Sequence, residues 1–78
     1  PYFQGNRAQV ERSMAVGRQV RGLRKIKGMT QAQLARAARI LRPNLSRIEA
    51  GKHRSTLETL EKLAAALKVP VVDLIVRR

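Results

Sequence analysis

The chain has 78 residues, of which 17 are lysine or arginine and only five are acidic, so its formal net charge is +12. It contains no cysteine and a single histidine, which excludes disulfide bridges and thiolate metal sites and leaves too few ligands for a histidine-based metal site. No apolar run approaches the roughly eighteen residues that a membrane-spanning helix needs. We therefore expect a cytoplasmic protein with one small domain.

The first five residues, "PYFQG", resemble the end of a protease recognition site left by an expression tag. We therefore take residues 6–78 as the single domain. The only aromatic residues, Tyr2 and Phe3, lie in the tag segment. A core of Leu, Ile, Val, Met and Ala without aromatic residues favours packed helices over sheets, so the composition predicts an all-α fold.

The first two predicted helices lie in the N-terminal half of the chain. The first covers about residues 8–27, and Gly28 ends it. Thr30 and Gln33 have the spacing of a capping box for a second, short helix over Gln31–Ala38. The apolar stripe of the first helix consists of Val10, Met14, Val20, Leu23 and Ile26.

The third predicted helix carries a proline near its start. Proline lacks an N–H group and is tolerated only in the first turn of a helix, where that group would have no partner anyway. Pro43 therefore predicts that the third helix begins beside it and runs to Ala50, with Gly51 as its stop. Arg42 then lies at the N-terminus of this helix.

Two further helices complete the predicted bundle. Ser55 or Thr56 caps the amphipathic segment "TLETLEKLAAALK", and Ser55 with Glu58 has the spacing of a second capping box. Pro70 suits the first position of a last short helix, "PVVDLIV", which is apolar nearly all round. Five helices with tight connections predict one compact all-α bundle.

The positive charge is concentrated in the first two thirds of the chain. No acidic residue occurs between Glu11 and Glu49. Such asymmetry favours nucleic acid as a partner over a merely solvated basic surface, which normally carries interspersed acids. The basic residues in this interval are Arg12, Arg18, Arg21, Arg24, Lys25, Lys27, Arg36, Arg39, Arg42 and Arg47.

The second and third predicted helices are short and joined by only a few residues. This arrangement is typical of the helix-turn-helix unit, whose second helix enters the major groove. The register of "VGRQVRGLRKIKGMTQAQLARAA", "LSRIEAGK" and "TLETLEKLAAALKVP" resembles the Cro/repressor-type (Xre-like) helix-turn-helix family from about residue 16 to 75. The resemblance implies a five-helix, lambda-repressor-like DNA-binding fold with its helix-turn-helix at about residues 30–50.

The predicted recognition helix, about residues 42–50, carries three candidate base-reading residues, Arg42, Asn44 and Arg47. Arginine can contact guanine O6 and N7, and asparagine can contact adenine N6 and N7, in a bidentate manner. Arg42 and Arg47 lie too far apart in sequence to contact the same base, and Asn44 is expected on a base or a phosphate. The alternative is that all three contact only phosphates.

The family resemblance implies further contacts outside the recognition helix. Family members use the glutamine at the position of Gln31 to hold a phosphate at a helix N-terminus, although a generic polar first-turn residue is the alternative. Arg24 and Glu49 are implied to form an ion pair that braces the first helix against the end of the third, and Arg24 can also contact phosphate. The other phosphate candidates are Arg36, Lys52, His53 and Arg54, with Arg18 and Arg21 as generic ones.

Two positions depart from the family pattern. Relatives usually have glycine at the position of Arg39, where a left-handed conformation costs other residues about 1 kcal/mol. Relatives also tend to have serine or threonine at the position of Leu41, and leucine cannot cap the third helix. The turn is therefore expected to be reshaped or to follow a longer second helix.

These features predict a sequence-specific double-stranded DNA-binding transcriptional regulator, a repressor, that binds a pseudo-palindromic operator as a homodimer. The dimer surface is expected on the last helix at Val72, Ile75 and Val76. One alternative is an antitoxin that binds a partner toxin or a restriction–modification controller, either of which autoregulates its operon. Another is a sequence-indifferent nucleoid or RNA binder, which the lack of stacking aromatic residues disfavours. We predict no catalytic residues, cofactor or metal.

Overall fold

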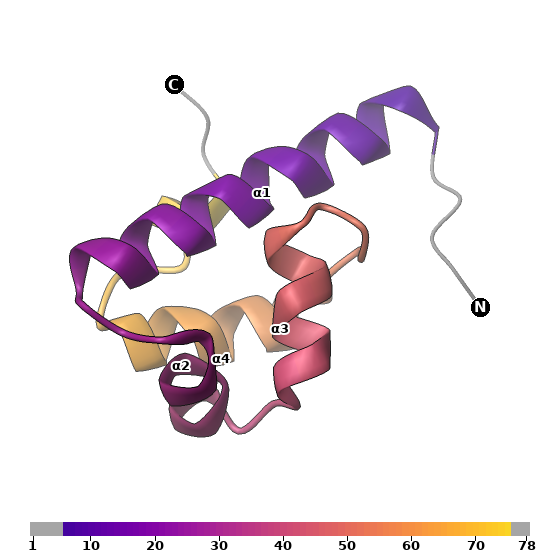
Figure 1. Ribbon diagram of the computed structural model, residues 1–78. Coiled ribbons are helices and arrows are strands. Elements are labelled where there is room, and N and C mark those ends of the chain that lie inside the picture. The colour runs from indigo at the N-terminus through magenta and orange to yellow at the C-terminus, as the bar shows by residue number, and fades with distance from the viewer. Residues whose placement is uncertain (1–5, 76–78) are drawn as a thin grey trace.

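The computed structural model describes residues 6–75, which form five α-helices and no strand. The all-α fold predicted from composition and periodicity is therefore confirmed. Long helix α1 runs along one side of the molecule and contacts α3, α4 and α5, whereas α2 packs against α3 and α4 (Figure 1). The tag segment, residues 1–5, and Val76 of the predicted dimer surface lie outside the described residues. The helices are α1 (Arg7–Ile26), α2 (Gln31–Ala38), α3 (Arg42–Glu49), α4 (Leu57–Leu67) and α5 (Val72–Ile75).

Capping boxes define the starts of α1 and α2. Thr30 and Gln33 make the predicted box, in which each side chain accepts a hydrogen bond from the backbone N–H of the other residue, at 2.8 and 3.1 Å. Asn6 and Gln9 form an equivalent box in front of α1, which the sequence prediction missed. Helix α2 has the predicted bounds, and α1 is displaced from its predicted bounds by one residue at each end.

The start of α4 corrects one prediction. Thr56 is the N-cap, and its hydroxyl accepts a hydrogen bond from the Thr59 N–H at 3.2 Å. The predicted capping box between Ser55 and Glu58 is wrong, because α4 begins at Leu57 and Thr59 occupies the third helical position. The Ser55 hydroxyl is buried instead and has no hydrogen-bond partner among the described residues.

The start of α5 also differs from its prediction. Pro70 does not occupy the first helical position, since α5 begins at Val72. The carbonyl of Pro70 accepts a hydrogen bond from the Asp73 N–H at 3.0 Å, so the proline belongs to a turn that leads into the helix. No helix within residues 6–75 is long and apolar enough to span a bilayer.

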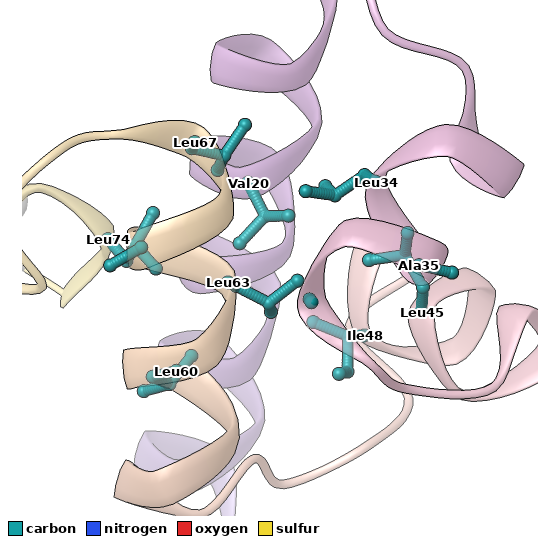
Figure 2. Close-up of a cluster of buried hydrophobic side chains, with 11 residues drawn as sticks. Val20, Leu34, Ala35, Leu45, Ile48, Leu60, Leu63, Leu67 and Leu74 are labelled. Atoms are coloured by element: carbon teal, nitrogen blue, oxygen red, sulfur yellow. The ribbon is translucent and has the colours of Figure 1, made fainter.

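One hydrophobic core joins the five helices (Figure 2). Each helix contributes at least one buried side chain to this core. Burial of each large apolar side chain stabilises the fold by about 1.5–3 kcal/mol. Leu45 and Ile48 attach α3 to this core and leave the opposite side of α3 free. The core residues are Val20, Leu34, Ala35, Ala38, Leu45, Ile48, Leu60, Leu63, Ala64, Leu67 and Leu74.

Helix α1 crosses the C-terminal end of α3 at a glycine. A Cβ atom on Gly17 would overlap the backbone carbonyl oxygen of Ile48 and would lie 2.8 Å from that of Glu49. Gly22, one and a half turns further along α1, has no atom within 4 Å of such a position. Of the two glycines in this helix, only Gly17 therefore permits the close approach of α3.

The turn between α2 and α3 keeps the left-handed conformation despite its arginine. Arg39 has φ 58° and ψ 44°. Its N–H donates to the Arg36 carbonyl at 3.1 Å, and the Ile40 N–H donates to the Ala35 carbonyl at 3.0 Å. The expectation of a reshaped turn or a longer second helix is thus wrong, because these two bonds close α2 where a glycine would close it.

Candidate nucleic-acid interface

Helix α3 begins where Pro43 predicts. Leu41 is the N-cap, with φ −73° and ψ 139°, and its side chain makes no capping hydrogen bond. The Leu41 carbonyl accepts hydrogen bonds from the N–H groups of Asn44 and Leu45 at 3.0 and 3.1 Å. Pro43 is the second helical residue, so its missing N–H group leaves no gap in the helix. The helix ends at Glu49, one residue before the predicted Ala50.

The outward face of α3 is basic. Arg42, Ser46 and Arg47 are exposed, whereas Leu45 and Ile48 are buried on the opposite side. Consecutive residues of an α-helix are about 100° apart, which places Ser46 between the two arginines on this face. Sequence reasoning missed Ser46, and its position four residues after Arg42 is the signal that would have found it.

The third predicted reader is less accessible than the two arginines. Asn44 is half-buried, and its position along the helix places it beyond Arg47 at the edge of the outward face. An asparagine at the edge of a reading face can contact either a base or a flanking phosphate. The structure therefore keeps open the same two roles that the sequence allowed for Asn44.

A buried ion pair fixes the C-terminal end of α3 against α1. Arg24 donates from Nε to Glu49 Oε2 at 2.7 Å and from Nη2 to Oε1 at 3.1 Å, so the contact is bidentate. The side chains of Arg24 and Glu49 are 11% and 3% exposed. The ion pair that the family resemblance implies is therefore present. Removal of one partner from such a pair typically costs about 3–5 kcal/mol.

The same carboxylate also holds the N-terminus of α2. Gln31 Nε2 donates to Glu49 Oε1 at 3.0 Å, which links the first residue of α2 to the last residue of α3. Sequence reasoning missed this contact. The Thr30 hydroxyl caps the N–H group of Gln33, but those of Gln31 and Ala32 have no partner within the helix. These two groups can bind an anion even while the Gln31 side-chain amide is bound to Glu49.

Arg24 is less suited to the phosphate contact that the sequence allowed. Its third guanidinium nitrogen, Nη1, donates to the Met29 carbonyl at 2.8 Å. All three nitrogens of the group therefore make hydrogen bonds within the fold, and little of the side chain faces solvent. The geometry gives Arg24 a bracing position rather than one on an open surface.

The remaining phosphate candidates are exposed. Arg36 lies on α2, and the other three candidates follow α3 directly in the loop that leads to α4. Gly51 has φ 74°, and the Lys52 N–H donates to the Arg47 carbonyl at 2.9 Å, so this loop turns sharply at the end of α3. Nowhere in residues 6–75 do three potential metal ligands come together. The three loop candidates are Lys52, His53 and Arg54.

The charges are segregated by element. Within α2, the turn and α3, the only acidic residue is Glu49, and it is buried and paired with Arg24. The exposed acids Glu58 and Glu61 lie on α4, and Asp73 lies on α5. A positive potential therefore gathers over the outward side of α2 and α3, which attracts a polyanion.

Two short helices joined by a tight left-handed turn, with a basic outward face on the second, define a helix-turn-helix domain. The chain belongs to the helix-turn-helix family HTH_3, whose family model matches residues 20–74. The chain is 40% identical over 58 residues to an immunity repressor protein of Bacillus phage phi105, a match that covers 74% of this chain. The chain spans about 40% of the length of that curated relative.

Solved structures with the same fold include two bacterial regulators. The restriction-modification controller protein C.AhdI from Aeromonas hydrophila has a TM-score of 0.78 at 31% identity, and the match covers 80% of this chain and 94% of the controller. The clp gene regulator ClgR from Corynebacterium glutamicum has a TM-score of 0.76 at 34% identity, with 80% of each chain covered. The five-helix, helix-turn-helix fold implied by the sequence is thus confirmed.

Proposed function

We propose that this chain is a DNA-binding transcriptional regulator that represses a promoter by inserting α3 into the major groove of its operator. The observation that carries the proposal is the outward face of α3, where Arg42, Ser46 and Arg47 are exposed and no acidic side chain competes for them. The similarity to a phage immunity repressor and to two bacterial regulators supports it.

In this proposal the side chains of α3 read bases and the flanking groups bind phosphates. Arg42 and Arg47 each contact a guanine edge, and Asn44 contacts an adenine or a phosphate beside them. The N-terminus of α2 at Gln31 holds one phosphate through its free backbone N–H groups. Arg36, Lys52, His53 and Arg54 add phosphate contacts, which set the position of the domain without selecting a sequence.

We further propose that the regulator acts in the cytoplasm as a homodimer on a pseudo-palindromic operator. Val72 and Ile75 on α5 are each 46% exposed, although their neighbour Leu74 is buried in the core. In this proposal a second copy covers these side chains across a two-fold axis. Reader helices about 34 Å apart would match half-sites one helical turn apart.

A restriction–modification controller is the second candidate function. The observation that favours it is the similarity to the controller from Aeromonas hydrophila, since 94% of that controller is covered by the match. Both candidates are DNA-binding regulators and differ in the promoter they control. Binding of the chain to promoters of an adjacent restriction–modification operon, compared with unrelated promoters, distinguishes them.

The test of the proposed function begins with selection of binding sequences from random DNA duplexes. The affinity for the selected duplex and for a scrambled duplex is then measured by fluorescence anisotropy at several matched salt concentrations. We expect the selected duplex to bind at least about 1,000-fold more tightly than the scrambled duplex. A ratio near one at every salt concentration would overturn the proposal in favour of sequence-indifferent binding.

Two variants and one control test the assigned readers. Arg42→Ala and Arg47→Ala should each lower the affinity for the selected duplex by about 5- to 150-fold, with a smaller effect on the scrambled duplex. Lys62→Ala also removes one positive charge, but from the exposed side of α4, next to Glu58. This control should change both affinities little and equally. Equal losses on both duplexes for the arginine variants would show that these residues contact only phosphates.

A further inference from the structure

Two apolar residues flank Arg42 at the N-terminal end of α3. Leu41 is 69% exposed, and Pro43 is also exposed. The preceding residue, Ile40, packs against the hydrophobic core. The turn therefore packs one large, partly buried apolar side chain against the core and leaves the next one, Leu41, exposed.

Leu41 provides no side-chain cap for α3 and lies outside the hydrophobic core. A serine or threonine N-cap contributes about 1 kcal/mol through a hydrogen bond to the first turn, and Leu41 makes no such bond. Single exposed leucines are common on protein surfaces. This one, however, adjoins the proposed reader Arg42, which indicates a role in binding rather than in folding.

The charges around Leu41 select the kind of partner that can cover it. Its exposed neighbours include Arg39 and Arg42, and no exposed acidic side chain lies on α2, the turn or α3. An ordinary apolar protein surface would not compensate these charges. The major groove does, because it combines phosphates with one apolar group on the base edges, the C5-methyl group of thymine.

We infer that Leu41 contacts the 5-methyl group of a pyrimidine at or next to the base pair read by Arg42. This inference rests on the proposed function and adds a base preference that no hydrogen-bonding side chain of α3 supplies. The recognised chemistry is a 5-methylpyrimidine, which in DNA is thymine or 5-methylcytosine. Leu41 therefore distinguishes a methylated from an unmethylated pyrimidine, which the guanidinium group of Arg42 does not do.

The test replaces each thymine of the selected operator, one at a time, by uracil. Uracil keeps every hydrogen-bonding group of thymine and lacks only the methyl group, so the comparison isolates the apolar contact. For the unmodified protein we expect one position in each half-site where uracil weakens binding about four-fold, the value for loss of one buried methyl group. If no thymine position is sensitive, the inference is overturned.

Two leucine variants assign the effect to a side chain. Leu41→Ala should bind the thymine and uracil operators with equal affinity. Leu57→Ala is the matched control, because Leu57 is 60% exposed but lies on α4, and it should keep the four-fold discrimination. Discrimination that persists in Leu41→Ala, or that disappears in Leu57→Ala, would overturn the assignment.

A third variant separates recognition from folding. Leu41→Ser can supply the missing cap, so it should melt at a higher temperature than the unmodified protein while it loses thymine discrimination. Loss of both stability and discrimination would instead mean that Leu41 has a structural role, which contradicts the inference.

One further comparison tests whether the methyl group itself is recognised, and the selection result shows whether the proposed function or only this inference fails. The sensitive pair is replaced by C·G in one duplex and by 5-methylcytosine·G in a second duplex. If the methyl group itself is recognised, the methylated duplex should bind about four-fold more tightly than the unmethylated one. Equal binding of these two duplexes would contradict the inference. If selection enriches no sequence, the proposed function fails. If it enriches one whose thymines are all insensitive to uracil, only the inference about Leu41 fails.

Discussion

The substitution of alanine for Gly17 tests how α3 is held in place. The added Cβ atom would overlap the backbone carbonyl oxygen of Ile48, and a backbone carbonyl cannot rotate aside as a flexible side chain can. Helices α1 and α3 would have to separate, which would also strain the ion pair between Arg24 and Glu49. We therefore expect a cost near the upper end of the range for overpacked cores, about 3 kcal/mol.

Gly22→Ala is the matched control for this prediction. The same substitution in the same helix removes the same conformational penalty of glycine, about 1 kcal/mol, but meets no atom within 4 Å. Gly22→Ala should therefore stabilise the fold by about 1 kcal/mol, whereas Gly17→Ala should destabilise it by about 2 kcal/mol once the same gain is subtracted from its cost.

Thermal unfolding followed by circular dichroism measures the difference. For a domain of this size each 1 kcal/mol shifts the melting temperature by about 4–8 °C. We expect Gly22→Ala to melt about 4–8 °C higher and Gly17→Ala about 8–16 °C lower than the unmodified protein. Equal melting temperatures for the two variants would refute the close crossing of α1 and α3.

Three further substitutions test the parts around this crossing. Glu49→Gln should lower the free energy of unfolding by about 3–5 kcal/mol, because it leaves Arg24 buried without a counter-charge, and unchanged melting would refute the bracing role. Arg39→Gly should raise the melting temperature by about 4–8 °C through relief of the left-handed conformation, and a lower melting temperature would show that the arginine makes a stabilising contact. Lys52→Ala should weaken binding to selected and scrambled duplexes alike and reduce the slope of log affinity against log salt by about one, while an unchanged slope would exclude a phosphate contact.

The sequence predicts the helices where local chemistry alone decides their limits. Thr30 and Gln33 define the start of α2 because each satisfies the backbone N–H of the other. Pro43 likewise defines the start of α3, since an α-helix tolerates proline only in its first turn. These signals depend on neighbours within a few residues, and the tertiary structure did not alter them.

Predictions fail where the surrounding fold decides between locally equivalent choices. Ser55 and Thr56 are both competent caps, and the path of the chain buries the hydroxyl of Ser55 so that Thr56 caps α4. Arg39 adopts a conformation that its own preference disfavours, because the hydrogen bonds that close α2 and the packing of Ile40 against the core outweigh a cost of about 1 kcal/mol. Neither outcome can be read from the residues themselves.

The sequence predicts only some contacts of the candidate site, because others depend on how the helices pack. The ion pair between Arg24 and Glu49 follows from the family resemblance, and it is present in the structure. The hydrogen bond from Gln31 to the same carboxylate has no such signal, because nothing in the sequence shows that the start of α2 lies beside the end of α3. Only the packed structure brings these two helix ends together.

The two ends of α3 have different roles, and this difference explains how the recognition surface can change without loss of the fold. At the C-terminal end, Gly17 of α1 permits the close approach of α3, and Arg24 and Gln31 both bind the buried carboxylate of Glu49. At the N-terminal end, Leu41 has no capping bond, and Arg42 is exposed. Because the buried contacts that hold α3 lie at its C-terminal end, substitution of Glu49 should destabilise the fold, whereas substitution of the exposed Leu41 or Arg42 should change sequence preference without destabilising it.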